Sequence, residues 1–346
     1  MERDNVSWIV ERLHGLYGDR VEVVVVDDDS PDGTWLEALR AMVRLGIDGV
    51  VVRRINVRGL SSAILDGIYM ALSERVVIMD ADGQHPPEKV GELAQALEGA
   101  DVAVGTRYAP GGGVAEWSPI RKLISRAATL VAKLLLPEAR RLSDPMSGFF
   151  AVKRSIVVSR RRELNPLGFK ALLEILVKCR IERVAEVPYT FAPRRAGRSK
   201  LGTKQIIQFI LHVLRLSRWR PLRFATVGAA GTVVNLATLA LLSIAAPVLV
   251  RDLFIAGSAI AIEVSTLFNF SMHERWTFRD RRFGSWVRRL AWFHAAVAPA
   301  IAAQYSVANA LHYGLGLHPI IAQFIGILVG FTINYTISEL RVWAKR

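Results

Sequence analysis

Residues 75–87 read RVVIMDADGQHPP, and this stretch decides how the first part of the chain folds. Its β-branched apolar beginning predicts a strand over 75–82, followed by a turn. Asp80 and Asp82 are two positions apart at the end of this strand, so both can point into one crevice, with Gln84 nearby. Such oxygen ligands suit Mg²⁺ or Mn²⁺, which complete their shells with substrate phosphates. We therefore predict a metal site formed by Asp80, Asp82 and Gln84.

Further short β-branched runs precede and follow this stretch and alternate with amphipathic helical patterns. Strands are predicted over 21–29, 49–54 and 101–107, and helices over 33–45 and 61–72. This alternation predicts an α/β domain with a parallel sheet covered on both faces. Ligands of such sheets bind beyond the carboxyl ends of the strands, where this chain carries its carboxylates.

A second acidic cluster stands at 23–33, VVVVDDDSPDG. If the strand continued through it, Asp27 and Asp29 would face one way and Asp28 the other. Several adjacent carboxylates are costly unless a cationic or donor-rich ligand offsets their charge. The chain contains no GxGxxG or Walker A motif, so we expect a bound phosphate to be held by metal and basic side chains.

The C-terminal part differs sharply in composition. The whole chain has 51% hydrophobic and 22% charged residues and a net charge of +14, so apolar and charged residues must be segregated. Apolar stretches long enough to cross a bilayer predict four spans. They cover residues 222–250, 253–272, 290–315 and 320–338.

Basic residues frame these stretches unevenly. They cluster before the first span, between the second and third, and after the fourth, which predicts that both termini are cytoplasmic. The same cations suit anionic lipid head groups, and without an aromatic-rich basic module we expect no nucleic acid partner. The single cysteine, Cys179, excludes an intrachain disulfide and Cys-rich metal folds.

The spans also carry signs of an internal repeat. Phe224 precedes Asn235 by the same spacing with which Phe293 precedes Gln304. Near the ends of the second and fourth spans, Asn269 and Glu274 match Asn334 and Glu339. These matches predict a tandem duplication of a helix pair.

Taken together, several motifs resemble one known family. The motifs are VVVVDDDSPDGTW, RGLSSA, MDADGQHPPE, VGTRY, RKLIS, DPMSGFFAV, NPLGFKALLEIL and EVPYTF. They resemble the polyprenyl phosphate (dolichol-phosphate) mannose synthases, which are family 2 inverting glycosyltransferases of the GT-A fold, and the spans resemble GtrA-like membrane domains. The resemblance implies transfer of mannose from GDP-mannose to a polyprenyl (dolichyl) phosphate, with Mg²⁺ or Mn²⁺ as cofactor.

The resemblance also implies roles for individual residues. Asp28 and Asp29 would contact the nucleotide base and ribose, and Asp80 and Asp82 the metal-bound diphosphate. The residues expected to bind phosphate at the reacting centre are Arg107, Arg121 and Ser125, and those expected in a loop closing over the substrates are Arg194, Ser199 and Lys200. Asp82, Arg107 and Arg121 are the predicted catalytic residues. We expect no general base, because a phosphate acceptor is already anionic.

One feature departs from the family pattern. A first strand with a Pro-Thr-Tyr-Asn-Glu-like end normally precedes the helix that here begins near Met1, and only Glu2 of that nucleotide-binding segment remains. We expect the native chain to start about ten residues earlier, since a strand of ordinary length is missing. Without that strand, backbone groups inside the sheet would lack partners.

The expected domains are a GT-A domain over 1–200, an amphipathic interface helix or linker over 201–221, and a membrane domain over 222–346. Apolar stripes over 120–134 and 206–214 fit either a soluble core or a membrane surface. Two other functions remain open: a polyprenyl phosphate glucosyltransferase that uses UDP-glucose, and a non-catalytic transporter or anchor for lipid-linked sugars.

Overall fold

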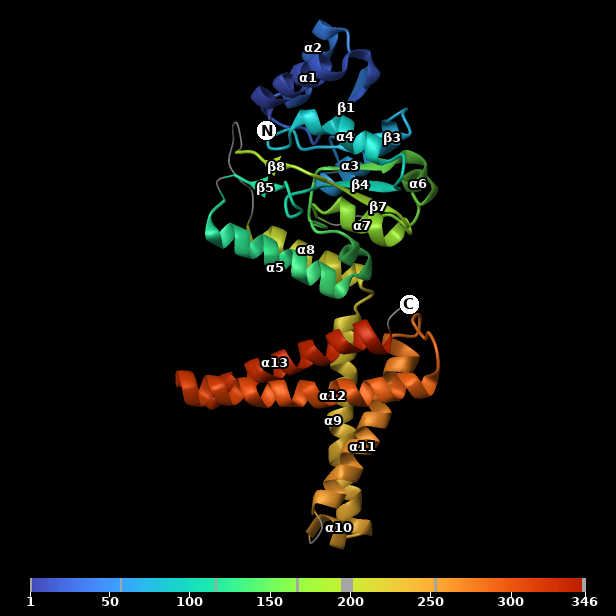
Figure 1. The fold of residues 1–346 in the computed structure, drawn as a ribbon, viewed down its shortest axis with the longest axis vertical. Coiled ribbons are helices and arrows are strands. Elements are labelled where there is room, and N and C mark those ends of the chain that lie inside the picture. The colour runs from blue at the N-terminus through green and yellow to red at the C-terminus, as the bar shows by residue number, and fades with distance from the viewer. Residues whose placement is uncertain are drawn as a thin grey trace. The chain divides into compact units, whose positions relative to one another are not determined.

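The computed structural model describes residues 2–56, 58–115, 117–165, 168–193, 202–251 and 254–343. The chain forms two compact units, Met1–Leu216 and Ser217–Arg346. The elements of the first unit are α1 (Arg3–Tyr17), β1 (Val23–Asp27), α2 (Thr34–Leu45), β2 (Gly49–Arg53), α3 (Leu60–Met70), β3 (Arg75–Ile78), α4 (Val90–Ala96), β4 (Val102–Thr106), β5 (Gly113–Val114), α5 (Pro119–Leu135), β6 (Phe150–Lys153), α6 (Arg154–Ser159), α7 (Ala171–Lys178), β7 (Val184–Pro188), β8 (Thr190–Phe191) and α8 (Thr203–Leu216) (Figure 1).

The central sheet has the strand order β3-β6-β4-β7. Strands β1 to β4 lie within the predicted ranges, but β1 ends at Asp27 and β3 already at Ile78, so Asp80 and Asp82 follow the strand instead of ending it. The prediction of a parallel sheet is wrong. β6 runs antiparallel to both β3 and β4 and separates them, whereas β7 is parallel to β4. Local periodicity predicts that a segment is extended, and it carries no information about the direction of its neighbours.

The residues of β4 and β6 alternate between two apolar cores. Ala103 and Ala151 lie in a core with α1, α2 and α4, whereas Val102 and Val104 lie in a core with α3, α6 and α7. All five residues of β4 are buried, as expected for a strand covered on both faces. The β4 end is thereby held rigidly, which matters because Arg107 follows it directly.

The smaller sheets stand apart from the central one. β1 pairs in parallel with β2, and β5 with β8. In the described ranges no ladder joins β1 to β3, although Val25 of β1 and Val77 of β3 pack against the same core. The sheet is therefore divided between β1 and β3, and shared apolar packing rather than backbone hydrogen bonding holds the two parts together.

The elements of the second unit are α9 (Arg220–Ala245), α10 (Val248–Arg251), α11 (Phe254–Met272), α12 (Trp286–Asn309) and α13 (Pro319–Ile337). The four longer helices correspond to the four predicted spans. Of the described helices, only α9 is both long and apolar enough by itself to cross a membrane. α11 and α13 each continue into one π-helical turn, His273–Thr277 and Ser338–Val342 respectively.

Helix α8 packs within the first unit. Phe209, Val213 and Leu216 of α8 share a buried cluster with Ala132 of α5 and Leu173 of α7. In the same interface the Glu174 carboxylate of α7 lies 3.2 Å from His212 Nε2 of α8 and 3.1 Å from Lys178 Nζ. Burial alone would raise the pKa of Glu174, but hydrogen bonds from His212 and the Asn165 amide, with the charge of Lys178, lower it to about 2.

We predict that Glu174→Gln destabilises the protein at pH 7 by roughly 1–3 kcal/mol, since His212 loses its buried anionic partner. The folded pKa of Glu174 is depressed from 4.5, so its contribution is fully present above pH 4.5 and is lost as the pH falls towards 2. Thermal unfolding of the variant and wild type should therefore converge over that range. The exposed carboxylate of Glu163, which pairs with Arg160, provides the control: Glu163→Gln should leave unfolding unchanged. A pH-independent deficit in Glu174→Gln would contradict this assignment.

Candidate active site

The Asp80–Asp82 motif forms a tight turn after β3. The backbone N–H of Gln84 donates to Asp82 Oδ1 at 3.1 Å. Gly83 adopts φ 75°, a left-handed conformation that favours glycine. Asp82 is buried, whereas the Asp80 side chain is about one third exposed at 36%. The backbone therefore bends so that one carboxylate is enclosed and the other reaches the surface.

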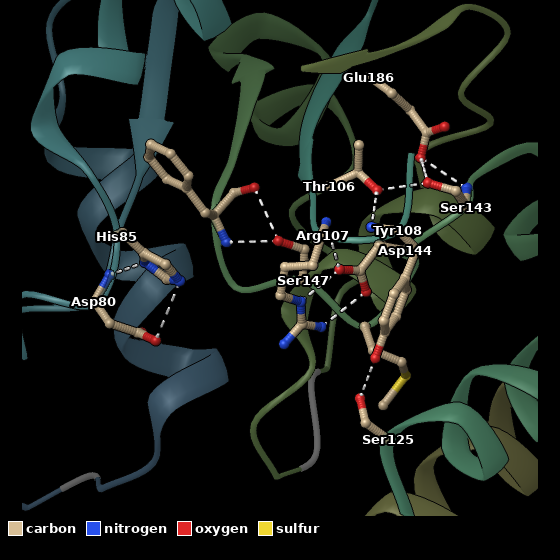
Figure 2. Close-up of polar contacts among 12 residues, drawn as sticks. Asp80, His85, Thr106, Arg107, Tyr108, Ser125, Ser143, Asp144, Ser147 and Glu186 are labelled. Atoms are coloured by element: carbon tan, nitrogen blue, oxygen red, sulfur yellow. Dashed lines mark hydrogen bonds and ion pairs between the residues drawn. The ribbon is translucent and has the colours of Figure 1, made fainter. Parts of the chain in front are cut away.

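The side chain of His85 packs against this turn. Its Nδ1 accepts the Asp80 amide N–H at 2.9 Å, and its ring stacks on Phe149 with centroids 4.9 Å apart (Figure 2). Tyr189 and Phe191 pack edge-on against the same ring. Complete burial lowers the pKa of His85 to about 3, so the imidazole is neutral and acts as a hydrogen-bond acceptor that orients the turn.

Gln84 ties the turn to the segment that follows β8. The side-chain Nε2 of Gln84 donates to the backbone carbonyl of Ala192 at 3.0 Å. The backbone carbonyl of Gln84 accepts the backbone N–H of Ala192 at 3.1 Å. Any metal ligand supplied by this side chain would therefore be Oε1. The predicted loop residues Arg194, Ser199 and Lys200 come later in the chain and lie outside the described residues.

Arg107 emerges from the end of β4 into a buried ion pair. Its Nε and Nη2 donate to the two carboxylate oxygens of Asp144 at 2.6 and 2.8 Å (Figure 2). Asp144 is fully buried and Arg107 nearly so. Because guanidinium has five N–H donors, this fork leaves Nη1 and one Nη2 proton to bind an anion.

Aromatic rings bring the predicted phosphate-binding residues together. Trp117 lies beside both guanidinium groups, with Arg107 Cζ 5.2 Å and Arg121 Cζ 4.5 Å from its ring centroid. The Tyr108 hydroxyl lies 2.8 Å from Ser125 Oγ on α5 (Figure 2). Arg107, Arg121 and Ser125 therefore form one cationic and hydroxyl-bearing cluster, although they come from β4 and α5.

No role was predicted for Lys170, which bonds the Asp144–Gly148 segment that lies between these two groups. Its Nζ donates to the Met146 carbonyl at 2.6 Å, and the charges of Arg107, Asp144 and Asp80 act on it. Burial and the Arg107 charge lower the pKa of Lys170 to about 8. A signal was present in the sequence: Lys170 occupies the N-cap of α7, where an acceptor side chain is usual and the helix dipole disfavours a cation.

The acidic cluster after β1 is held by arginines. Asp28 accepts Arg54 Nε at 2.6 Å and the Gly59 amide at 2.7 Å. Asp29, at φ 57°, accepts Arg53 Nε at 2.7 Å. β1 ends at Asp27, so the predicted strand-like alternation through Asp29 is wrong.

Glu2 lies close to the continuation of this acidic loop. Its amide donates to Thr34 Oγ1 at 3.0 Å, and Thr34 in turn bonds Asp32. Its carboxylate accepts the Asn5 amide at 2.6 Å. The contacts therefore bring the start of α1 to the start of α2.

Carboxylates suit a hard cation, and the Asp80–Asp82 turn fits one on chemical grounds. Across the described ranges, no group of three His, Cys, Asp or Glu side chains is arranged to hold a metal. Two carboxylates and an amide oxygen form an incomplete shell, which matches an ion whose other ligands are phosphates and water. A Cβ at Gly148 would come within 3.4 Å of Asp80 Oδ2, so glycine keeps this face of the carboxylate open.

Comparisons with known proteins define the class. Residues 2–159 match the family model for glycosyl transferase family 2, and residues 223–343 match that for the GtrA/DPMS transmembrane domain. The protein is therefore a membrane glycosyltransferase with a GT-A-like catalytic domain, as the motifs predict.

The particular family follows from full-length relatives. The chain is 40% identical over 351 residues to a dolichol-phosphate mannosyltransferase of Pyrococcus furiosus, covering 99% of this chain and 97% of that protein. The Saccharomyces cerevisiae dolichol-phosphate mannosyltransferase is 41% identical over 204 residues, covering 57% of this chain and 74% of its own. This chain belongs to the dolichol-phosphate mannosyltransferase family.

Among solved structures, a glucosyl-3-phosphoglycerate synthase from Mycobacterium tuberculosis in complex with Mn²⁺, uridine diphosphate and glucosyl-3-phosphoglycerate is similar to this chain. It matches at a TM-score of 0.46 and 20% identity, covering 62% of this chain and 76% of that one.

We predict that Asp144→Asn lowers glycosyl transfer on the order of 10- to 100-fold, because Arg107 loses its charged partner and its fixed orientation. Initial rates with the purified full chain would measure this. A variant at another ion-paired carboxylate of this unit, Asp101→Asn, should keep most of the activity, because Asp101 bonds the backbone around Arg183 instead. Equal losses in the two variants would indicate a general folding defect.

Proposed function

We propose that this protein transfers mannose from GDP-mannose to a polyprenyl (dolichyl) phosphate at the cytoplasmic face of a membrane. Its family membership supports the reaction class. The observation that carries the proposal is the short segment from Asp144 to Gly148, whose first residue bonds Arg107 and whose last residue lies against the Asp80 carboxylate. The predicted metal ligands and the anion-binding arginine therefore lie close enough for two phosphorylated substrates to meet.

On the donor side, Asp80, Asp82 and Gln84 would hold Mg²⁺ or Mn²⁺. The ion would neutralise charge on the departing nucleoside diphosphate. Asp28 and Asp29 would accept hydrogen bonds from the base and ribose, since carboxylates bonded by Arg54 and Arg53 retain further lone pairs. Glu2 would contribute to the same nucleotide region.

On the acceptor side, Arg107 and Arg121 would orient the lipid phosphate, with Ser125 donating a hydrogen bond. A phosphate monoester is already anionic near neutral pH, so its oxygen can attack the sugar without a general base. One oxygen–carbon bond forms as the bond to the nucleoside diphosphate breaks, which inverts the anomeric centre. Arg194, Ser199 and Lys200 would close over the substrates in this scheme.

Helices α5 and α8 supply a surface suited to a lipid acceptor. They lie side by side in the first unit (Figure 1) and expose several large apolar side chains while Lys122 and Arg126 are also exposed. The exposed apolar residues are Ile120, Leu123, Leu130, Ile206, Ile207 and Ile210. Such a face fits the head-group region of a bilayer, and we propose four membrane spans with both termini cytoplasmic.

The central test is donor- and metal-dependent labelling of polyprenyl phosphate by the purified full chain. We expect product from labelled GDP-mannose and Mg²⁺ or Mn²⁺, and loss of product with EDTA. Asp82→Asn should lower the rate at least about 100-fold, whereas Asp19→Asn, which changes an exposed carboxylate, should not. If labelled lipid formed only from UDP-glucose, the transferred sugar would be glucose and not mannose. Unchanged transfer by Asp82→Asn would reject the role of Asp82 in metal binding.

A second prediction concerns the apolar face of α5 and α8. Leu123→Ser combined with Ile207→Ser should lower transfer to a long-chain polyprenyl phosphate in vesicles at least about 30-fold, because each exposed side chain contributes about 1–3 kcal/mol on insertion and about 1.4 kcal/mol is a factor of ten. Transfer to a short, water-soluble prenyl phosphate should be unchanged. Leu72→Ser removes a leucine that is even more exposed but lies outside these helices, and it should have no effect. Equal losses with both acceptors would refute a lipid-contacting role.

A further inference from the structure

The second unit contains a pair of equivalent helix hairpins. Arg220 and Phe224 near the start of α9 correspond to Arg289 and Phe293 near the start of α12 at the same spacing. At the other end of each hairpin, α11 and α13 both pass into a π-helical turn that carries one buried glutamate, Glu274 or Glu339. The duplication predicted from sequence therefore has a structural counterpart.

Reciprocal ion pairs join these hairpins. Arg220 of the first hairpin lies 3.5 Å from Glu339 of the second, and Arg289 of the second binds Glu274 of the first at 2.7 and 2.8 Å. Arg281 also pairs with Glu339, and Trp343 Nε1 donates to Glu274 at 2.6 Å. Asp280 lies 3.0 Å from Arg220 and balances the third arginine. Buried charges require such partners, so these three arginines are neutralised within the unit.

A chamber of about 320 Å³ lies between the same helices. Its polar lining consists of the imidazole of His273 and of amides and hydroxyls, namely Thr232, Asn235, Ser265, Thr266, Asn269 and Asn334. Phe224 and Phe293, the equivalent aromatic residues of the two hairpins, also line it. The volume lies at the lower end of small-molecule sites, about 300–1,000 Å³.

The lining has hydrogen-bonding capacity that the protein does not use. The hydroxyls of Thr232, Ser265 and Thr266 donate to backbone carbonyls, which leaves their oxygens as acceptors. Asn269 Oδ1 is buried without a hydrogen-bond partner. Unmet polar groups are expensive in a membrane domain and indicate a functional site.

The charge of the lining restricts the ligand. None of the residues that line the chamber, all of them described, is Asp, Glu, Lys or Arg. His273 also lines it, but its ring is buried, stacks on Phe224 with centroids 4.2 Å apart and has its Nδ1 3.0 Å from Thr277 Oγ1, so it is committed to the packing of the unit. A phosphate or nucleotide would therefore find no Lys or Arg there, and a wholly apolar ligand would leave the amides unmet. A neutral group with many hydroxyls and apolar C–H faces would match both the amides and the aromatic rings.

We propose that this chamber is a binding site for the neutral sugar ring of a free or lipid-borne saccharide. The site is separate from the catalytic unit and does not depend on which sugar that unit transfers. Amide and hydroxyl side chains bind the sugar hydroxyls, and Phe224 or Phe293 contacts a face of the ring.

The test uses the full chain in lipid nanodiscs and saturable binding of two probes, methyl β-D-mannopyranoside and octyl β-D-mannopyranoside. Tetraethylene glycol monooctyl ether carries the same chain without a sugar and should not compete. Binding of both mannosides identifies a site for a free sugar, whereas binding of the octyl compound alone identifies a lipid-borne sugar. Binding of neither, or full competition by the sugar-free ether, overturns the proposal.

Two variants locate the binding. Asn235→Leu should weaken it at least 10-fold, whereas Asn309→Leu, whose amide bonds Tyr305 on its own helix outside the chamber, should not. Gly228→Leu should block it sterically, because Gly228 lines the chamber and a Cβ there meets no atom within 4 Å. If these variants still transfer sugar from the nucleotide donor to the lipid, they are folded. A loss of binding in the chamber can then be distinguished from a failure of the catalytic proposal. Wild-type affinity in both Asn235→Leu and Gly228→Leu would exclude the chamber.

Discussion

The hydrogen bond from the Asp80 amide to the buried imidazole of His85 is the interaction on which the catalytic geometry depends. Burial among aromatic rings keeps this histidine neutral, so its Nδ1 can accept and the turn has one orientation. One of these rings, Phe191 of β8, directly precedes Ala192, the residue that Gln84 bonds. The carboxylate turn is thus fixed to the sheet before any ligand binds, which is the form of preorganisation that favours catalysis by positioning.

Charge balance explains the rest of the active site. Arg107 is held by the buried Asp144, and the half-buried Lys170 bonds the Met146 carbonyl in the segment that follows Asp144, so this region contains both signs of charge. An unpaired buried member of this group would be strongly destabilising. Desolvation and then the charge of Arg107 lower the pKa of Lys170 to about 8.

The second unit also pairs its buried charges, but with a different arrangement of residues. Two buried arginines and two buried glutamates are paired across the equivalent hairpins, Arg220 with Glu339 and Arg289 with Glu274. The pairing removes net charge from the hairpin interface and leaves a neutral polar chamber beside it. Duplicated sequences therefore produce one composite interface rather than two separate ones.

The sequence by itself determined the segregation into an α/β catalytic part and an apolar helical part, the positions of β1 to β4, and the carboxylate turn. These features follow from hydropathy and short periodicities, which are properties of neighbouring residues. Only the tertiary structure decided that β6 separates β3 from β4, that Asp144 orients Arg107, that Lys170 bonds the segment between the two charged groups, and that the hairpins exchange ion pairs. Each of these joins segments distant along the chain, and such pairings are selected by burial and charge compensation in the folded state, which no local pattern encodes.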